Sequence, residues 1–267
     1  MLVPGDPRSP VLLHVPHAGT EVPGWVRDHL LLDDAELATE LAALTDHRTD
    51  ALAAAAADAA RVRPFVLVNP ISRFVVDVER FPDEREEMAA VGMAAVYTHG
   101  TRGQRIRADD PAHHAALRAA FYEPWAAAVR HAVADRLAAV GRAVLVDVHS
   151  YPRAPLPYEL HADGPRPPVC LGTDAFHTPP ELLAAARAAF GAGTTLDSPF
   201  SGVYVPLAHL HREPRVHAIM VEIRRDGYLV EPAGPATDGF TALAGALTRL
   251  VDTMTALTPL VDGGSPG

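Results

Sequence analysis

The chain has 267 residues, 48% of them hydrophobic and 21% charged, which supplies enough apolar material for one large α/β domain. The formal net charge is −10 and there is no run of Lys or Arg, which argues against nucleic-acid binding. The sequence shows no apolar stretch of membrane-spanning length, no secretory signal pattern, and one cysteine, Cys170, which excludes an internal disulfide. We therefore expect one domain over residues 1–267, with a frayed tail at 262–267, in the reducing cytoplasm.

The order of apolar runs and helix or strand breakers predicts strands separated by helices. Strands are expected at residues 11–15, 65–68, 74–78, 143–148, 169–172 and 218–223. A long helix capped by Asp34 is expected to continue to Ala60, followed by one or two helices over 110–140 that end at Gly141. Further helices are expected over 179–190 and 240–257. This alternation predicts a mostly parallel or mixed sheet with helices on both faces, and a site beyond the carboxyl ends of its strands.

Three polar clusters come at the ends of predicted strands. His17 follows the first strand, Asp147 and His149 end the strand that begins at 143, and Glu222 with Arg224 ends the last strand. Asp147 and His149 share one face of a strand, so they fit a metal ligand and the carboxylate that orients it. The alternative is a strand end whose two side chains meet water. A lone His17 is more often structural, but two histidines and a carboxylate form the usual catalytic zinc set.

Paired charges mark two further segments. Asp46 and Asp50 are four residues apart in the predicted helix, so they share one face. That face either carries a carboxylate to the metal or is solvated. Arg73 and Arg80 flank the predicted strand at 74–78. A guanidinium fork can bind a carboxylate or polarise a carbonyl oxygen, and salt bridges with neighbouring acidic residues are the alternative.

Other catalytic schemes find no support in the sequence. It contains no G-x-S-x-G elbow, no Walker A motif and no G-x-G-x-x-G motif. Cys170 lies in an apolar strand without an adjacent basic residue, so we expect a core side chain and not a nucleophile. The polar loop at 97–103 fits either a lid or a solvated turn, and the oligomeric state is not indicated.

Seven segments, taken together and in order, resemble the N-formylglutamate amidohydrolase family. They are V-P-H-A-G at 15–19, D-H-R-T-D at 46–50, S-R-F-V-V-D-V-E-R at 72–80, D-V-H-S-Y at 147–151, L-G-T-D at 171–174, P-F-S-G-V-Y at 199–204 and E-I-R-R at 222–225. The likeness extends over residues 10–230, most of the chain. The family is similar in fold to zinc carboxypeptidases and aspartoacylases, which implies a three-layer α/β/α domain with a mixed, mostly parallel sheet.

The resemblance also implies a reaction and a set of site residues. The reaction is hydrolysis of a small acidic N-acyl amino acid, N-formyl-L-glutamate, to formate and L-glutamate, as a step of histidine degradation. The implied cofactor is Zn²⁺, for which Mn²⁺ or Co²⁺ can substitute. The implied roles are metal binding by His17 and His149, with Asp46 as the favoured third ligand and Asp50 as its alternative, and general base catalysis by Glu222. We further expect oxyanion stabilisation by Arg73 and substrate binding by Arg80, Arg224 and Ser150. Asp147 is expected to orient a ligand or, alternatively, a nearby arginine.

Two departures from the family pattern bear on the substrate. Glu79 stands where relatives read the Asn of D-L-N-R, and a Glu79 that pointed into the pocket would repel a glutamate side chain. A segment that resembles Y-x-P-Y-H appears at 122–126 without its His. Another zinc N-acyl amino acid hydrolase, or a carboxypeptidase-like enzyme, is therefore the first alternative. A non-catalytic binding protein on the same fold is the second.

Overall fold

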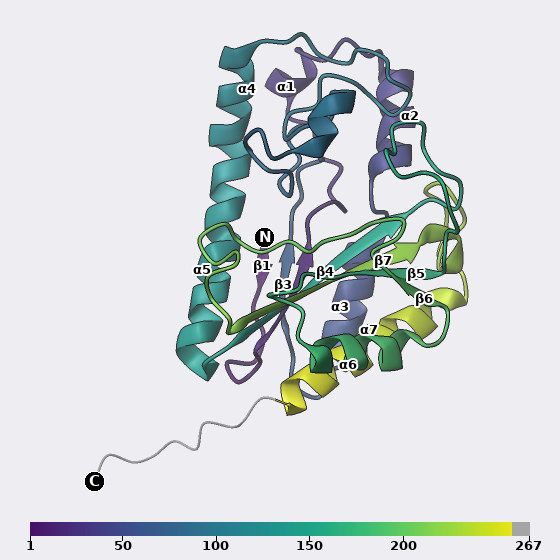
Figure 1. Cartoon of the computed structure of the whole chain (residues 1–267). Coiled ribbons are helices and arrows are strands. Elements are labelled where there is room, and N and C mark those ends of the chain that lie inside the picture. Colours follow the sequence, from purple (N-terminus) through teal and green to yellow (C-terminus); the bar gives the residue numbers. More distant parts are fainter. Residues whose placement is uncertain (258–267) are drawn as a thin grey trace.

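The computed structural model describes residues 1–257, and a seven-stranded sheet runs through the lower half of the view in Figure 1. In spatial order the strands are β1 (Leu2–Val3), β3 (Phe65–Val68), β2 (Val11–Val15), β4 (Ala143–Tyr151), β7 (Val216–Arg224), β5 (Val169–Gly172) and β6 (Thr194–Leu196). The β1–β3 and β5–β7 pairs are antiparallel, and the other pairs are parallel. The predicted mixed, mostly parallel sheet is confirmed.

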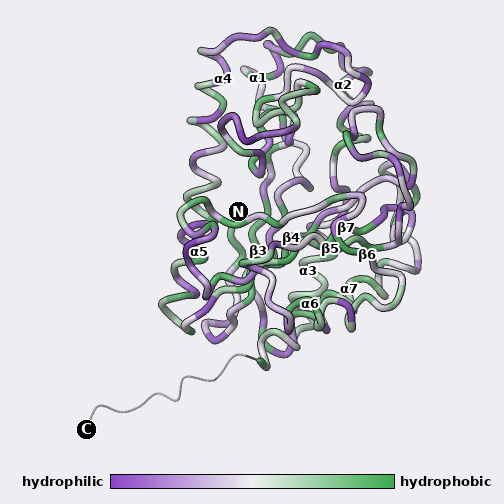
Figure 2. Tube along the Cα trace, in the orientation of Figure 1, coloured by the Kyte–Doolittle hydropathy of each residue, from purple (hydrophilic) through white to green (hydrophobic). Residues whose placement is uncertain are grey.

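Helices cover both faces of this sheet. One face packs against α3 (Thr49–Ala59), α6 (Pro180–Phe190) and α7 (Gly239–Ala256), whose alanine and leucine side chains join the apolar side chains of the strands. The other face packs against α5 (Glu123–Val140), which continues α4 (Pro111–Leu117) through one π-helical turn. Figure 2 shows hydrophobic segments along the strands and on α6 and α7. The layers are therefore helix, sheet and helix, as predicted.

The two central strands, β4 and β7, carry polar side chains at their carboxyl ends. All nine residues of β4 are buried, and β7 pairs with it residue by residue, so that His149 lies opposite Glu222. Four buried apolar side chains in β4 precede Asp147. The strand is therefore anchored by hydrophobic burial before its polar carboxyl end begins.

A third cluster of buried apolar residues comes from segments that Figure 1 shows above the sheet. It gathers α2 (Asp34–Leu44), the region around α1 (Gly24–Arg27), and the segments that hold Phe74 and Tyr97. This cluster supports the loops that form the outer wall of the site.

The predicted helix from Asp34 to Ala60 is wrong in two respects. Its cap is Asp33, whose side chain forms a capping box with Glu36, and the helix is divided into α2 and α3. Arg48, in the break, has a left-handed φ of 64°, which interrupts helical geometry. Asp46 therefore lies in a turn between two helices and shares no helix face with Asp50.

The predicted strand at 74–78 is also wrong, because this segment forms turns. The Val75 amide donates to the Ser72 carbonyl oxygen at 2.9 Å, which closes a turn at the start of the segment. Its apolar residues are buried because the turns fill the space between two hydrophobic clusters. A short apolar run does not distinguish this arrangement from a buried strand.

The other predicted elements are confirmed within one to three residues at most ends. The sequence pattern did not predict α1, β1 and β6, which have four, two and three residues. The tail at 262–267 lies outside the described residues. Within residues 1–257, no helix is both long and apolar enough to cross a membrane.

Candidate active site

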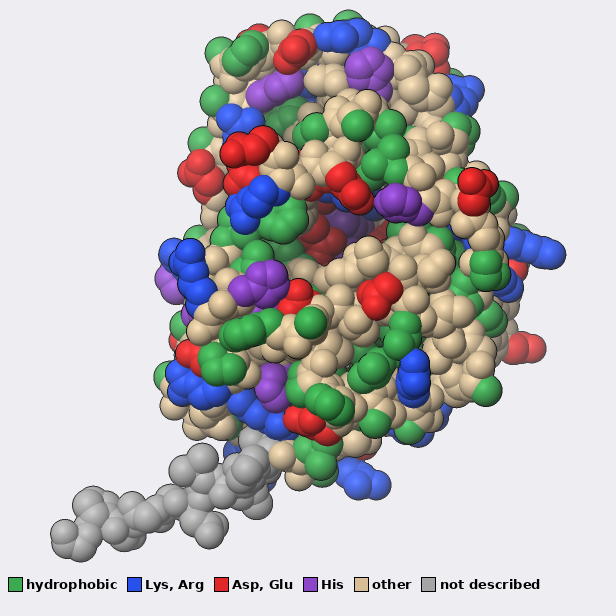
Figure 3. Space-filling model, viewed as in Figure 1, with side chains coloured by type: hydrophobic (Ala, Val, Ile, Leu, Met, Phe, Trp, Pro, Cys, Tyr) green, Lys and Arg blue, Asp and Glu red, His purple; other side chains and the backbone are tan. Residues whose placement is uncertain are grey.

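A cavity of about 190 Å³ opens at the carboxyl ends of β4 and β7. Figure 3 shows a hollow near the centre of this face, with acidic and histidine side chains at its base. The residues around it come from segments far apart in the sequence, and those with ionisable groups are His17, Asp46, Arg73, Asp77, Glu79, Arg80, Glu87, His149, Tyr151, Tyr158, Glu159, His161, Glu222 and Arg225. The site therefore lies where an α/β sheet places its ligands.

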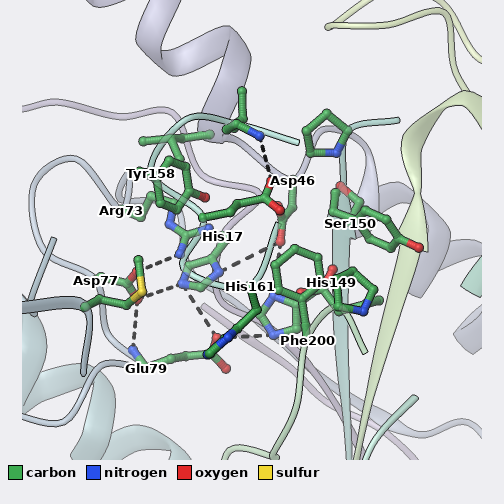
Figure 4. Close-up of a pocket in the computed structure, with 18 of the residues that line it drawn as sticks. His17, Asp46, Arg73, Asp77, Glu79, His149, Ser150, Tyr158, His161 and Phe200 are labelled. Atoms are coloured by element: carbon green, nitrogen blue, oxygen red, sulfur yellow. Dashed lines mark hydrogen bonds and ion pairs between the residues drawn. The ribbon is translucent and has the colours of Figure 1, made fainter. Parts of the chain in front are cut away.

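Two imidazoles form the centre of this cavity. His17 follows β2, and His149 lies near the end of β4, with 5.1 Å between the ring centroids. Both side chains are almost fully buried. Figure 4 shows the two rings between Asp46 on one side and Glu79 on the other. The predicted convergence of His17 and His149 is therefore present in the structure.

Of the two ring nitrogens of His17, Nε2 has a hydrogen-bond partner within residues 1–257 and Nδ1 has none. His17 Nε2 forms a 2.8 Å hydrogen bond with Asp77 Oδ1. His17 Nδ1 is buried and has no hydrogen-bond partner among residues 1–257, while Asp46 Oδ2 lies 3.8 Å away. The Asp46 amide donates to the His17 carbonyl oxygen at 3.0 Å, which fixes the two backbone segments together.

His149 is surrounded by three carboxylates. Its Nδ1 forms a 3.1 Å hydrogen bond with Asp46 Oδ2. Its Nε2 lies 3.1 Å from Asp147 Oδ1 and 3.2 Å from Glu79 Oε2, without hydrogen-bond alignment to a partner in the described chain. Burial opposes a charged ring, but Asp147 and Glu79 outweigh it and raise the pKa of His149 well above its usual value. The surroundings therefore strongly favour a positive charge at this place.

The same surroundings suit a metal cation. His17, His149 and Glu79 each offer a ligand atom within 4.8 Å of the others. Asp46 offers a second carboxylate, at the Nδ1 edges of both rings. Buried carboxylates are costly without a compensating charge. Imidazole nitrogens with carboxylate oxygens are the ligands of catalytic zinc sites, so the side chains present fit such an ion.

Asp77 connects His17 to Arg73 and Tyr97. Its Oδ2 accepts from Arg73 Nη2 at 2.7 Å and from the Tyr97 hydroxyl group. Arg73 Nε also donates to the Tyr97 oxygen at 2.9 Å. Burial would raise the pKa of Asp77, but the Arg73 guanidinium and His17 hold it well below its usual value. Tyr97 is therefore a buried support of the site.

The rest of the 97–103 loop is fixed to α2. The fully buried Glu40 accepts from the Thr101 amide at 2.8 Å and from the Thr101 hydroxyl at 2.9 Å. These contacts tie the loop down on the protein.

Glu222, on β7, lines the cavity. Its Oε2 is buried and unpartnered within the part of the chain that the structure describes. Burial, together with the charges of Asp46 and Glu79, raises its pKa to about 8, although His149 opposes this. A carboxyl group with a pKa near neutrality has the proton affinity that general acid–base catalysis requires.

The arginines differ in their placement. Arg80 lines the cavity, with its buried Nε 3.5 Å from Asp77 Oδ2 and its Nη1 3.6 Å from Glu86 Oε1. Arg224 does not line it, because its Nε binds Asp226 at 2.7 Å. Its neighbour Arg225 does, with Nε 3.1 Å from Ser150 Oγ and Nη2 3.4 Å from Asp46 Oδ1. Ser150 thus holds Arg225 in place.

Most of the residues singled out from the sequence meet in this cavity or directly behind it. The exceptions are Arg224 and Asp50, which is exposed on α3. Sequence analysis did not assign roles to Asp77, Glu79 as a possible ligand, or Arg225. In the sequence, Asp77 and Glu79 come shortly before Arg80, and Arg225 directly follows Arg224. Their nearness to residues that were already candidates is the sequence feature that could have pointed to them.

The fold and the site define an α/β enzyme with a buried histidine–carboxylate centre at the end of its sheet. The chain belongs to the N-formylglutamate amidohydrolase family, whose model matches residues 9–229. An N-formylglutamate deformylase from Pseudomonas aeruginosa is 29% identical over 236 residues, which cover 85% of this chain and 84% of that protein.

Two solved structures share the fold. N-formylglutamate amidohydrolase from Ralstonia eutropha superposes with a TM-score of 0.76 at 22% identity, over 94% of each chain. A protein from Agrobacterium tumefaciens superposes with a TM-score of 0.69 at 22% identity, over 97% of this chain and 96% of the other. The resemblance inferred from seven sequence segments is confirmed.

Proposed function

We propose that this protein hydrolyses the amide bond of N-formyl-L-glutamate with the help of a bound Zn²⁺ ion, and releases formate and L-glutamate. Family membership supports the reaction. The observation that carries the metal dependence is the buried pair of imidazoles, His17 and His149, surrounded by carboxylates at the base of the cavity. The place in histidine degradation and the cytoplasmic location stay predictions.

The proposed ligands are His17 Nδ1, His149 Nδ1 and an oxygen of Asp46. Asp77 already binds His17 Nε2, which leaves Nδ1 as the free nitrogen of that ring. Asp46 Oδ2 lies 3.8 Å and 3.1 Å from the two Nδ1 atoms. Zinc bonds to nitrogen and oxygen imply a separation of about 3.3 Å between tetrahedral ligand atoms. Asp77 and Asp147 would then orient the two rings through their outer nitrogens.

Glu79 is the competing carboxylate. It lies on the Nε2 side of both histidines, 3.6 Å from His17 and 3.2 Å from His149. An ion there would have to replace the Asp77 hydrogen bond to His17, whereas an ion beside Asp46 keeps it. We therefore assign the third ligand to Asp46, which requires the two Nδ1 atoms to come closer together on zinc binding, because the set whose ligand atoms lie within 4.8 Å of one another in this structure is His17, His149 and Glu79.

Zn²⁺ at this place would lower the pKa of a water molecule and polarise the formyl carbonyl group. Glu222 accepts a proton from the attacking water and passes it to the leaving amine. Arg73 donates from Nη2 to Asp77 and from Nε to Tyr97. Its Nη1 takes part in neither contact, so Nη1 is the atom that donates to the developing oxyanion. Arg80, whose Nε lies 3.5 Å from Asp77 Oδ2, binds a substrate carboxylate through its guanidinium group, and Arg225 is a further cation of the cavity wall.

The test is release of formate and glutamate from N-formyl-L-glutamate by native, chelated and zinc-restored protein. Chelation should abolish activity, and stoichiometric Zn²⁺ should restore it. N-acetyl-L-glutamate and a dipeptide serve as comparison substrates. Full turnover by protein shown to be metal-free would refute the metal dependence, and inert N-formyl-L-glutamate would refute the substrate.

Glu79 favours a second candidate, an N-formyl amino acid with an uncharged side chain. Its carboxylate lines the cavity, and its Oε1 is buried without a hydrogen-bond partner in residues 1–257. A second buried carboxylate beside it would be repelled. Comparing kcat/KM for N-formyl-L-glutamate and N-formyl-L-glutamine in the native protein and in Glu79→Gln separates the two substrates.

A further inference from the structure

A further buried histidine, His14, lies directly behind the proposed metal site. His14 on β2 is completely buried, with Trp125 of α5 stacked near one face and Tyr204 stacked on its ring at 4.7 Å between centroids. Its Nδ1 forms a 2.7 Å hydrogen bond with Asp147 Oδ1 and lies 3.4 Å from Glu79 Oε1. His14, Glu79 and Asp147 thereby form a second group with ligand atoms close enough to hold a cation.

Trp125 decides which nitrogen of His14 carries the proton. The indole N–H can only donate, and Trp125 Nε1 lies 3.2 Å from His14 Nε2 in a hydrogen bond. His14 Nε2 must therefore be the acceptor, without a proton of its own. In a neutral imidazole the proton then sits on Nδ1, which faces Asp147. A nitrogen that bears a proton has no lone pair for a metal.

We propose that Trp125 locks His14 as a hydrogen-bond donor to Asp147, so that this second cluster positions the ligand His149 and binds no ion of its own. Asp147 Oδ1 lies between the two histidines, 2.7 Å from His14 Nδ1 and 3.1 Å from His149 Nε2. The chain of contacts runs from α5 through β2 to the end of β4. It holds the carboxylate that orients His149, and this part of the proposal rests on the proposed function.

The first test is the tautomer of His14 in the native protein. Long-range ¹H–¹⁵N correlation spectra distinguish protonated from bare ring nitrogens, and the His14→Gln spectrum assigns the signals. The lock predicts a protonated Nδ1 and a bare Nε2, in both metal-free and zinc-loaded protein. A protonated Nε2, or loss of the Nδ1 proton when zinc is added, would overturn the proposal.

The second test is zinc stoichiometry and affinity, measured by native mass spectrometry and chelator competition. The native protein should bind one zinc ion per chain. In His14→Gln the affinity should fall, by up to about tenfold, because Asp147, which orients the ligand His149, loses its hydrogen bond from His14. Trp125→Phe keeps an aromatic side chain but removes the indole N–H, so the His14 proton can move to Nε2 and a second, weaker equivalent of zinc should bind.

Trp25→Phe, on the other tryptophan of the chain, is the matched control and should leave both quantities unchanged. Two zinc ions on the native protein, or one on Trp125→Phe, would contradict the lock. An unchanged affinity in folded His14→Gln would contradict the positioning role. If the native protein bound no zinc, the proposed function would fail, while the tautomer measurement would still decide the lock.

Discussion

Glu222→Gln should change how the stability of the metal-free protein depends on pH. The pKa of the Glu222 carboxyl is raised from 4.5 to about 8, chiefly by burial. The folded state binds the Glu222 proton more tightly than the unfolded state does. The contribution of this proton to the free energy of unfolding is therefore complete below pH 4.5. It is lost as the pH rises toward 8. The free energy of unfolding of the metal-free native protein should therefore fall across this range.

The structure sets the size of the effect. Each tenfold change in proton affinity is worth about 1.4 kcal/mol, so a pKa that moves from 4.5 to about 8 corresponds to at most about 5 kcal/mol. The raised pKa of His149 has an effect in the same direction. As the pH rises and His149 loses its proton, its stabilising contribution to the free energy of unfolding also disappears. Glutamine keeps the shape of the side chain and removes only the Glu222 part.

The assay is urea unfolding of both chelated proteins from pH 5 to pH 9. Glu222→Gln should show the smaller decrease and should be the more stable of the two at pH 9. Saturating Zn²⁺ should flatten the native curve, because a cation beside Glu222 favours the carboxylate. Parallel curves for the two metal-free proteins would refute the assignment of a protonated, buried Glu222 at neutral pH.

Three further substitutions test separate parts of the site. Asp46→Ala should weaken zinc binding about a hundredfold, whereas Glu79→Gln should change it less than tenfold. Chelator competition measures both affinities, and a larger loss in Glu79→Gln than in Asp46→Ala would make Glu79 the ligand. Asp77→Asn leaves the Arg73 charge buried without its partner, so urea unfolding should show a loss of about 3–5 kcal/mol, and a loss under 1 kcal/mol would contradict the network. Arg80→Ala should raise KM for N-formyl-L-glutamate about tenfold or more with kcat little changed, and an unchanged KM would place the substrate carboxylate elsewhere.

The sequence predicts the layers of this fold because β4 and β7 are long apolar runs bounded by clear breakers. Their polar ends, at His149 and Glu222, also point directly to the site. Short elements such as β1 and β6 carry too few residues for a periodic signal. The segment from Phe74 to Val78 has the composition of a strand but is buried as turns, and no local pattern distinguishes the two.

The remaining features that the sequence did not predict depend on contacts between segments far apart in the chain. The helix break that buries Asp46 depends on the left-handed Arg48 and on the backbone hydrogen bond from Asp46 to His17. Arg225 enters the cavity while Arg224 turns toward Asp226, which is decided by how the chain leaves β7. The role of Trp125 depends on α5 packing its indole against β2.

The position of the metal is the central claim, and anomalous scattering at the zinc edge from crystals of zinc-loaded protein tests it most directly. The account predicts one strong peak within bonding distance of His17 Nδ1, His149 Nδ1 and an Asp46 oxygen. A peak on the Nε2 side with Glu79, or no peak near the two imidazoles, would contradict it.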